Sequence, residues 1–294
     1  MAIYEVRASG LEYLALVTEL LQRARLADAE AGLWEAADLQ WWSRTPRRSD
    51  GIDQIFWVDD EGPVAGVVLT DWDRAWGCDP IVVPGVSTVT LPTVWAWALE
   101  AVNALDLESV EVLARDDDLE LQGLLTGAGF VADDWQSGIS WMNASDRPGV
   151  APLPEGFALL DRSRATAGPH PMQKRSGEGV EARLKQCSLY NPALDLAVEA
   201  ADGQIAGYAL FWFDPVTEVG LVEPMRVEDE YQRRGLARAM LTAGLDRLAG
   251  RGARRLKVGY ATDVARALYV GAGFRVTSTT TSYRCVPDVT RTRG

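Results

Sequence analysis

Residues 225–245 read MRVEDEYQRRGLARAMLTAGL, and this stretch carries the strongest structural signal in the chain. An apolar strand pattern over residues 221–227 leads through a short acidic turn into QRRGLA (residues 232–237), where an amphipathic helix begins. The first amide groups of a helix have no partner inside it, and the helix dipole makes that end positive. The stretch therefore predicts an anion site at a strand-to-helix turn.

The residue types at this turn suit a phosphate group. Gly235 and the small Ala237 let a ligand approach the backbone closely, and Arg233, Arg234 and Arg238 add positive charge. Neither GxxxxGK[ST] nor GxGxxG is present, so the turn is not a Walker loop or a dinucleotide fingerprint. A helix N-terminus that carries only solvated arginines is the alternative interpretation.

A second motif follows at residues 262–274, which read TDVARALYVGAGF. The two motifs together resemble the GCN5-related N-acetyltransferase family. Its acyl-CoA pyrophosphate loop has the pattern Gln/Arg-x-x-Gly-x-Gly/Ala, and its later segment has the pattern Asn-x-x-Ala-x-x-Leu-Tyr-x-x-x-Gly-Phe. The resemblance covers residues from about 157 to 286, and the sequence departs from the pattern at Thr262, where the family usually has Asn.

The resemblance implies acetyl-CoA as the cosubstrate and no metal. Backbone groups of Met225 to Val227 would pair with the pantetheine arm as an extra strand would, and the amides of Arg233 to Arg238 would hold the pyrophosphate. The cofactor-binding residues that it implies are Met225, Arg226, Val227, Gln232, Arg233, Arg234, Gly235, Leu236, Ala237, Arg238, Thr262 and Ala265.

The resemblance also implies a catalytic acid, Tyr269, which would protonate the CoA thiolate as it leaves. A phenol with a pKa of ~10 is a suitable donor to a thiolate. The alternative role for Tyr269 is packing beside Phe274. 

The family's base is variable and is often a Glu on the fourth strand. Glu223 is the leading candidate here, and Pro224 beside it predicts a bulge or a splayed strand because proline cannot donate to a ladder. Glu218 and Asp214 are weaker candidates. A structural carboxylate that pairs with Arg226 is the alternative role for Glu223.

The chain contains an internal repeat. GAGF occurs at residues 127–130 and again at residues 271–274, and each copy follows a hairpin pattern, a strand and a helix. We therefore expect an α+β fold of two tandem acetyltransferase-like domains, each a mixed, mostly antiparallel sheet flanked by helices. The Pro- and Gly-containing residues 147–156 are the expected linker between a first domain, 1–146, and a catalytic domain, 157–294.

The first repeat lacks the features of the second. Alignment of the two GAGF segments sets Leu125 opposite Tyr269, and no arginine-containing loop precedes the helix that Pro92 begins. The first domain therefore looks like a degenerate acetyltransferase repeat that has lost CoA binding. Ten of the eleven tryptophans lie there. We expect most of them to pack in its core or at a seam against the second repeat, and a minority to form a wall of the acceptor pocket.

Charge separates the halves as well. The net charge is −13, with −17 on residues 1–150 and +4 on residues 151–294. The acidic total argues against nucleic-acid binding. No apolar run reaches the ~18 residues of a membrane span, and the sequence begins with no signal-peptide pattern. We expect a cytoplasmic monomer or homodimer with reduced, buried cysteines.

Two further expectations concern function. His170, the only histidine, lies between prolines, which predicts an exposed or rigid loop rather than the base. We expect an acetyl-CoA-dependent N-acetyltransferase that transfers an acetyl group directly to a primary amine of a small molecule or peptide. The alternatives are a tandem enzyme similar to mycothiol synthase, which also has a weak repeat before a working one, and a non-catalytic acyl-CoA-binding regulatory module.

Overall fold

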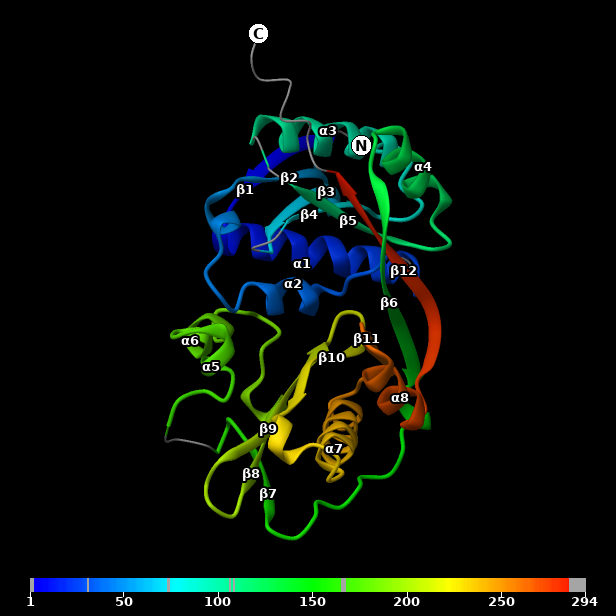
Figure 1. The fold of residues 1–294 in the computed structure, drawn as a ribbon. Coiled ribbons are helices and arrows are strands. Elements are labelled where there is room, and N and C mark those ends of the chain that lie inside the picture. Colours follow the sequence, from blue (N-terminus) through cyan, green and yellow to red (C-terminus); the bar gives the residue numbers. More distant parts are fainter. Residues whose placement is uncertain are drawn as a thin grey trace. The chain divides into compact units, whose positions relative to one another are not determined.

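The computed structural model describes residues 3–285 except 31, 73–74, 106, 108 and 165–167. The fold is mixed α/β with mostly antiparallel sheets flanked by helices, which confirms the predicted fold class (Figure 1). The chain forms two compact units. Unit 1 comprises Met1–Ala36, Pro46–Ser137 and Ser278–Gly294, and unit 2 comprises Ala37–Thr45 and Gly138–Thr277.

Unit 1 has the sheet order β1-β2-β3-β4-β5-β12, and its pairs are antiparallel except for the parallel pair β4 and β5. The long helix α1 packs on β3, while α3 packs on β3 and β4 from the other face of the sheet (Figure 1). Its elements are β1 (Tyr4–Ala8), α1 (Gly10–Ala27), η1 (Arg48–Gly51), β2 (Gln54–Asp59), β3 (Gly62–Asp71), β4 (Trp76–Val82), α3 (Leu91–Ala104), β5 (Val110–Arg115) and α4 (Leu119–Gly127).

Unit 2 has the sheet order β6-β11-β10-β9-β8-β7, again antiparallel except for one parallel pair, β10 and β11. Helix α7 packs on β9 and β10. The remaining elements are α2 (Ala36–Trp42), β6 (Val131–Asn143), η2 (Ala144–Asp146), β7 (Phe157–Asp161), α5 (Gln173–Ser176), α6 (Val180–Leu184), η3 (Pro192–Leu194), β8 (Asp195–Ala200), β9 (Ile205–Asp214), β10 (Val219–Val227), η4 (Asp229–Tyr231), α7 (Leu236–Gly250), β11 (Arg255–Tyr260), α8 (Asp263–Gly271) and β12 (Arg275–Cys285).

The units are not continuous in sequence. β6 begins among the residues of unit 1 and then pairs with β11 in unit 2, whereas β12 begins in unit 2 and then pairs with β5 in unit 1. Residues 37–45, from the first half of the sequence, belong to unit 2. The linker expected at residues 147–156 stays a prediction, but each half of the sequence contributes segments to both units.

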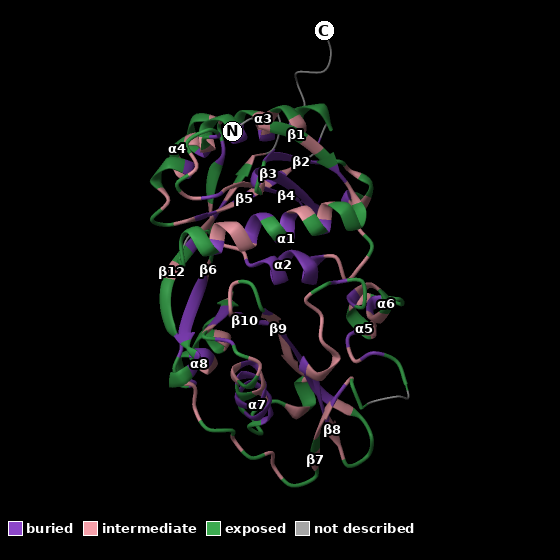
Figure 2. Cartoon of the chain, turned by 180° about the vertical axis from the view of Figure 1, so that it is seen from behind, coloured by how far each residue is buried: buried purple, intermediate pink, exposed green. Residues whose placement is uncertain are grey.

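The short helix α2 is unusual in its burial. All seven of its residues are buried, including the polar Asp38 and Gln40 (Figure 2). Polar side chains inside a protein need partners, because an unpaired buried polar group costs about 1–3 kcal/mol. The contacts that α2 makes within unit 2 therefore fix the position of this helix. Its side chains form part of the candidate site described in the next section.

Three general expectations can be compared with the described residues. No helix among them combines the length and apolar character needed to cross a bilayer. They contain no group of three or more His, Cys, Asp or Glu side chains arranged to hold a metal ion. All three cysteines are free, as expected, but only Cys78 and Cys187 are buried and Cys285 is half-buried.

Candidate functional site

The centre of the candidate site is the point where β10 and β11 separate. The parallel pairing of these strands ends at Val222 with Val258, while β10 continues antiparallel to β9 as far as Val227. The β9 register shifts between Val222 and Met225, so the bulged or splayed strand predicted from Pro224 is present. Beyond Val222, one edge of β10 therefore has no paired strand in the described part of the chain.

Glu223 lies at this separation and is held by two tryptophans. The indole Nε1 of Trp212 donates a 2.7 Å hydrogen bond to the Glu223 carbonyl oxygen. The indole of Trp41 donates a hydrogen bond to the Glu223 carboxylate. These contacts fix both the backbone and the side chain of the residue predicted to be the base.

The electrostatic surroundings of Glu223 suit a general base. The pKa of Glu223 is raised from its ordinary value to about 7, mainly by burial and to a smaller extent by the charge of Asp38. The charge of Arg44 and the hydrogen bond from Trp41 act in the opposite direction. A carboxyl group with a pKa near 7 accepts a proton efficiently at neutral pH.

The weaker candidates for the base have other partners. Glu218 forms a 2.8 Å ion pair with Arg254. Asp214 accepts a hydrogen bond of 2.9 Å from the amide of Val216 in the turn after β9. The alternative pairing of Glu223 with Arg226 is not observed, because Arg226 pairs with acidic residues that follow it, Glu228 and Asp229.

Helix α2 is held in unit 2 by buried polar contacts. Gln40 donates to the Ser188 hydroxyl at 2.9 Å and accepts from the Leu189 amide at 2.9 Å. The Cys187 thiol contacts the Gln40 carbonyl oxygen at 3.4 Å, and Arg183 donates to the Ser43 carbonyl oxygen. These contacts place Trp41 and Asp38 beside Glu223 as fixed parts of unit 2.

Tyr269 on α8 is the predicted acid. Its side chain is 7% exposed and packs edge-on against Phe274 with 6.1 Å between ring centroids, so the packing role considered for it is real. Burial raises the pKa of Tyr269, and the charge of Glu223 raises it further. The raised pKa keeps the phenol protonated at neutral pH, and no described residue takes up its hydroxyl by a hydrogen bond.

The turn before α7 has the backbone of an anion site. Arg233 (φ 60°) and Gly235 (φ 84°) are both in the left-handed region, which glycine adopts without strain and arginine seldom does. Such turns aim successive amide groups toward one side. The first amide of α7 that bonds back to the turn is that of Ala239, to the Gly235 carbonyl oxygen. The amides of Leu236, Ala237 and Arg238 have no acceptor among the described residues.

The arginines of this turn keep their charge available. Arg233, Arg234 and Arg238 are exposed, and none forms an ion pair with a described carboxylate. Arg234 and Arg238 donate instead to the carbonyl oxygens of Glu230, at 3.2 Å, and Gly271, at 3.3 Å. Gln232 donates to the Val227 carbonyl oxygen at 3.3 Å and thereby ties the turn to the end of β10.

The remaining predicted cofactor-binding residues lie at the end of β10 and at the start of α8. Met225, Arg226 and Val227 pair with β9 on one side, which leaves their other edge for an added strand. Thr262 caps α8 by accepting a hydrogen bond of 3.2 Å from the amide of Ala265. The hydroxyl that replaces the usual Asn therefore has a structural role.

Of the two alternatives expected for His170, an exposed or a rigid loop, the exposed loop is wrong, because its side chain is 3% exposed. Nε2 of His170 lies 2.7 Å from a carboxylate oxygen of Asp195, and Nδ1 accepts from the Met172 amide at 3.2 Å. The Tyr190 hydroxyl donates to the same Asp195 oxygen at 2.8 Å. His170 is a buried structural residue held by these hydrogen bonds.

Sequence reasoning missed the residues that α2 contributes. Trp41, Asp38 and Arg44 all act on Glu223, although they stand some 180 positions before it in the chain. The sequence signal that could have found them is the tryptophan pair at positions 41 and 42, because a wall of the acceptor pocket is one expected role for tryptophans of the first half. No sequence pattern identified which pair would do so.

The residues present fit acetyl-CoA. The unpaired edge of β10 can receive the pantetheine arm, and the free amides and unpaired guanidinium groups at the start of α7 match a pyrophosphate. A side chain at Gly235 would meet nothing within 4 Å, so the backbone there faces open space. The candidate site therefore combines an anion-binding turn and an unpaired strand edge with a buried carboxylate.

Comparison with known proteins agrees with this geometry. Residues 165–274 match the sequence model of the Acetyltransferase (GNAT) family. A mycothiol acetyltransferase from Clavibacter michiganensis subsp. michiganensis is 33% identical over 151 residues, which are 46% of this chain and 48% of that protein. A mycothiol acetyltransferase from Clavibacter sepedonicus is 29% identical over 76% of this chain and 78% of that protein. The matched region thus spans about half the length of the first relative.

Solved structures share the fold. A tandem GNAT protein from the clavulanic acid biosynthesis pathway has a TM-score of 0.68 and 16% identity, with 97% of this chain and 98% of that chain covered. A GCN5-related N-acetyltransferase from Sphaerobacter thermophilus has a TM-score of 0.61 and 19% identity, with 96% and 95% covered. At these identities the likeness concerns the fold alone.

Proposed function

We propose that this chain, of which residues 165–274 match the Acetyltransferase (GNAT) family, transfers an acetyl group from acetyl-CoA directly to a primary amine. The observation that carries the proposal is the position of Glu223. Its carboxylate lies where β10 leaves β11, with a pKa raised to about 7 by burial, and its charge acts on the hydroxyl-bearing Tyr269.

Acetyl-CoA would supply an acetyl group activated as a thioester. The turn from Gln232 to Arg238 would bind its pyrophosphate, and the free edge of β10 at Met225 to Val227 would bind its pantetheine arm. Thr262 and Ala265 at the start of α8 would border the same ligand.

The protein's own groups would move two protons. Glu223, directly or through a water molecule, would take a proton from the acceptor ammonium, so that the neutral amine can attack. The hydrogen bond from Trp41 would orient the carboxylate, and the hydrogen bond from Trp212 to the Glu223 carbonyl oxygen would hold the backbone beneath it. The Tyr269 hydroxyl would give its proton to the thiolate that leaves.

The nature of the acceptor follows from charge. Asp38 and Glu223 are two carboxyl groups at the same end of the site, which favours a positively charged amine over a neutral or anionic acceptor. The names of the two Clavibacter relatives support one specific candidate, an activity similar to that of a mycothiol acetyltransferase. The second candidate function is a non-catalytic acyl-CoA-binding module, and the presence of both Glu223 and Tyr269, which interact electrostatically, counts against it.

An assay for released CoA tests the proposal. Acetyl-CoA is incubated with the protein and a panel of amines that includes aminoglycosides, polyamines, amino acids, peptide N-termini and the unacetylated precursor of mycothiol. Release that depends on one amine, with a mass increase of one acetyl group on that amine, supports an N-acetyltransferase. Binding of acetyl-CoA without turnover on any amine supports the module.

A further inference from the structure

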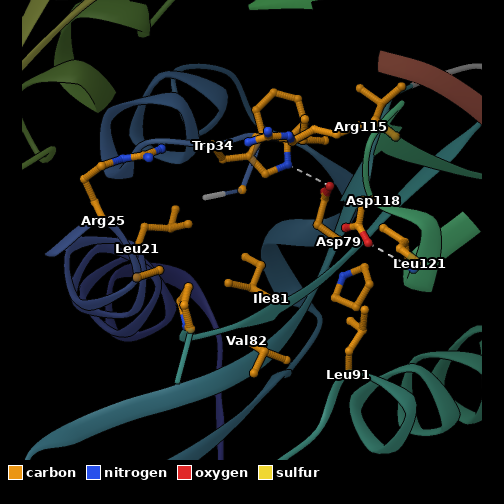
Figure 3. A pocket seen from close by; sticks show the side chains of 16 residues that line it. Leu21, Arg25, Trp34, Asp79, Ile81, Val82, Leu91, Arg115, Asp118 and Leu121 are labelled. Atoms are coloured by element: carbon orange, nitrogen blue, oxygen red, sulfur yellow. Dashed lines mark hydrogen bonds between the residues drawn. The ribbon is translucent and has the colours of Figure 1, made fainter. Parts of the chain in front are cut away.

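Unit 1 contains a cavity of about 190 Å³ that the proposed reaction does not use. It lies where β4 and β5 separate, because their pairing ends at Gly77 with Glu111 and Asp79 follows two residues later. Figure 3 shows side chains from α1, β4, β5 and the starts of α3 and α4 around it. The cavity is therefore lined by elements of one unit only.

Asp79 provides the main polar group of the cavity. Its side chain is buried, at 8% exposure, and one of its carboxylate oxygens accepts a 2.8 Å hydrogen bond from the indole Nε1 of Trp34 (Figure 3). No described cation forms an ion pair with it. Burial raises the pKa of Asp79 to about 6, so the carboxyl group is mostly ionised at neutral pH. A buried negative charge without a cation is costly, and a ligand cation would remove that cost.

The arginines that line the cavity already have carboxylate partners. Arg25 forms a 2.6 Å ion pair with Glu35, and Arg115 forms one of 2.6 Å with Asp117. Both guanidinium groups are thus directed to other acids rather than to Asp79. An anionic ligand would meet the Asp79 charge and find these arginines engaged.

The rest of the wall is largely apolar. It favours a ligand with a hydrocarbon body over a hydrated metal ion, because a metal ion needs several oxygen ligands and Asp79 supplies one carboxylate. A liquid water molecule occupies ~30 Å³, so the cavity has room for a ligand of roughly six to eight non-hydrogen atoms. The apolar residues of the wall include Leu21, Leu33, Ile81, Val82, Leu91, Leu113 and Leu121.

The internal repeat gives this cavity a counterpart in unit 2. Asp79-Pro80 precedes Glu223-Pro224 by 144 positions, which is also the spacing of the two GAGF segments. Asp118 and Thr262 have the same spacing, and both cap helices, with Asp118 accepting a 3.1 Å hydrogen bond from the amide of Leu121. Unit 1 therefore retains a buried carboxylate at the position equivalent to Glu223.

Other parts of the site have no counterpart in unit 1. The residue 144 positions before Tyr269 is the fully buried Leu125, and no arginine-containing turn precedes α3. Unit 1 thus has a carboxylate, Asp79, that can bind an ammonium ion. It lacks the arginine-containing turn that would bind phosphates and the tyrosine that would protonate a thiolate. We propose that this cavity binds a small primary amine with an apolar body, as its ammonium ion on Asp79, without acetylating it.

Calorimetric titration of the full chain with n-hexylamine tests this proposal, with 1-hexanol as the uncharged ligand of the same length. We expect hexylammonium to bind and hexanol to bind at least tenfold more weakly. Asp79→Asn keeps an acceptor for Trp34 and removes the charge, so it should weaken hexylammonium binding tenfold or more. Each titration is repeated in Glu223→Gln protein, where the Asp79-dependent binding should persist because Asp79 belongs to unit 1.

A second variant serves if Asp79→Asn fails to fold. Ile81→Trp fills the cavity with an apolar side chain and should abolish binding while the circular dichroism spectrum stays native. Equal binding of hexylammonium to native protein and Asp79→Asn, equal binding of the amine and the alcohol, or no binding of the amine at millimolar concentration would each overturn the proposal. Loss of binding in Glu223→Gln alone would assign the amine to unit 2 and also overturn it.

Discussion

The carboxylate of Glu223 raises the pKa of the Tyr269 hydroxyl, so a residue of β10 and a residue of α8 share one electrostatic environment. Their pKa values differ widely, because burial raises the pKa of the carboxyl group to near 7 and raises the pKa of the phenol far above neutral pH. Two neighbouring groups of this kind can accept and donate protons at the same pH.

Tyr269→Phe tests the proton donor. The change keeps the ring and its contact with Phe274 but removes the hydroxyl, so we expect kcat to fall about 10²- to 10⁴-fold. The dissociation constant for acetyl-CoA should stay within a factor of about three. Steady-state kinetics and titration measure the two quantities. Tyr283→Phe, a change in unit 1, is the matched control, and an unchanged kcat for Tyr269→Phe would exclude the acid role.

The pH dependence of kcat/KM tests Glu223 as the base. Because the base must be deprotonated, kcat/KM should rise as the pH increases through about 7 and then reach a plateau. This rise is the acidic limb of the pH profile. Glu223→Gln should abolish most of the activity and remove this limb from the residual rate. A limb near pH 7 that persists in Glu223→Gln would assign it to another group.

Changes in α2 should move that limb in opposite directions. Trp41→Phe removes a hydrogen bond that lowers the pKa of Glu223, so the limb should move to higher pH. Asp38→Asn removes a charge that raises this pKa, so the limb should move to lower pH. A purely structural role for α2 would lower activity in both variants and leave the midpoint in place.

These residues also show how far sequence reasoning reaches. The strand, turn and helix from residue 221 to 248 were predicted closely, because periodicity, glycine and the arginines act locally. The first residues of β4, from Trp76, are buried on both faces and do not alternate, so periodicity gives no signal for where this strand begins. The contribution of Trp41 depends on tertiary packing, for which a single sequence has no local signal.

The turn before α7 should control affinity for acetyl-CoA. Arg233→Ala and Arg234→Ala each remove a guanidinium that has no carboxylate partner among the described residues, and each should raise KM for acetyl-CoA about tenfold with a smaller change in kcat. The KM of native protein should also rise with salt. Arg275→Ala, an exposed position on β12, is the control, and equal effects there would argue for non-specific charge.

His170 should contribute to stability and not to the pH profile. His170→Ala leaves a buried Asp195 oxygen without one of its two partners, so the free energy of unfolding should fall by about 1–3 kcal/mol. Urea denaturation measures this loss. The limb near pH 7 should remain in the folded variant, and its disappearance would mean that His170 takes part in the proton transfer.

The measurement that tests the account most directly is calorimetric titration of the chain with acetyl-CoA. The account predicts binding of one acetyl-CoA per chain, which Arg233→Ala combined with Arg234→Ala weakens strongly and Asp79→Asn leaves unchanged. Binding of two molecules, binding that depends on Asp79 rather than on the two arginines, or no heat and no thermal shift at millimolar acetyl-CoA would contradict it.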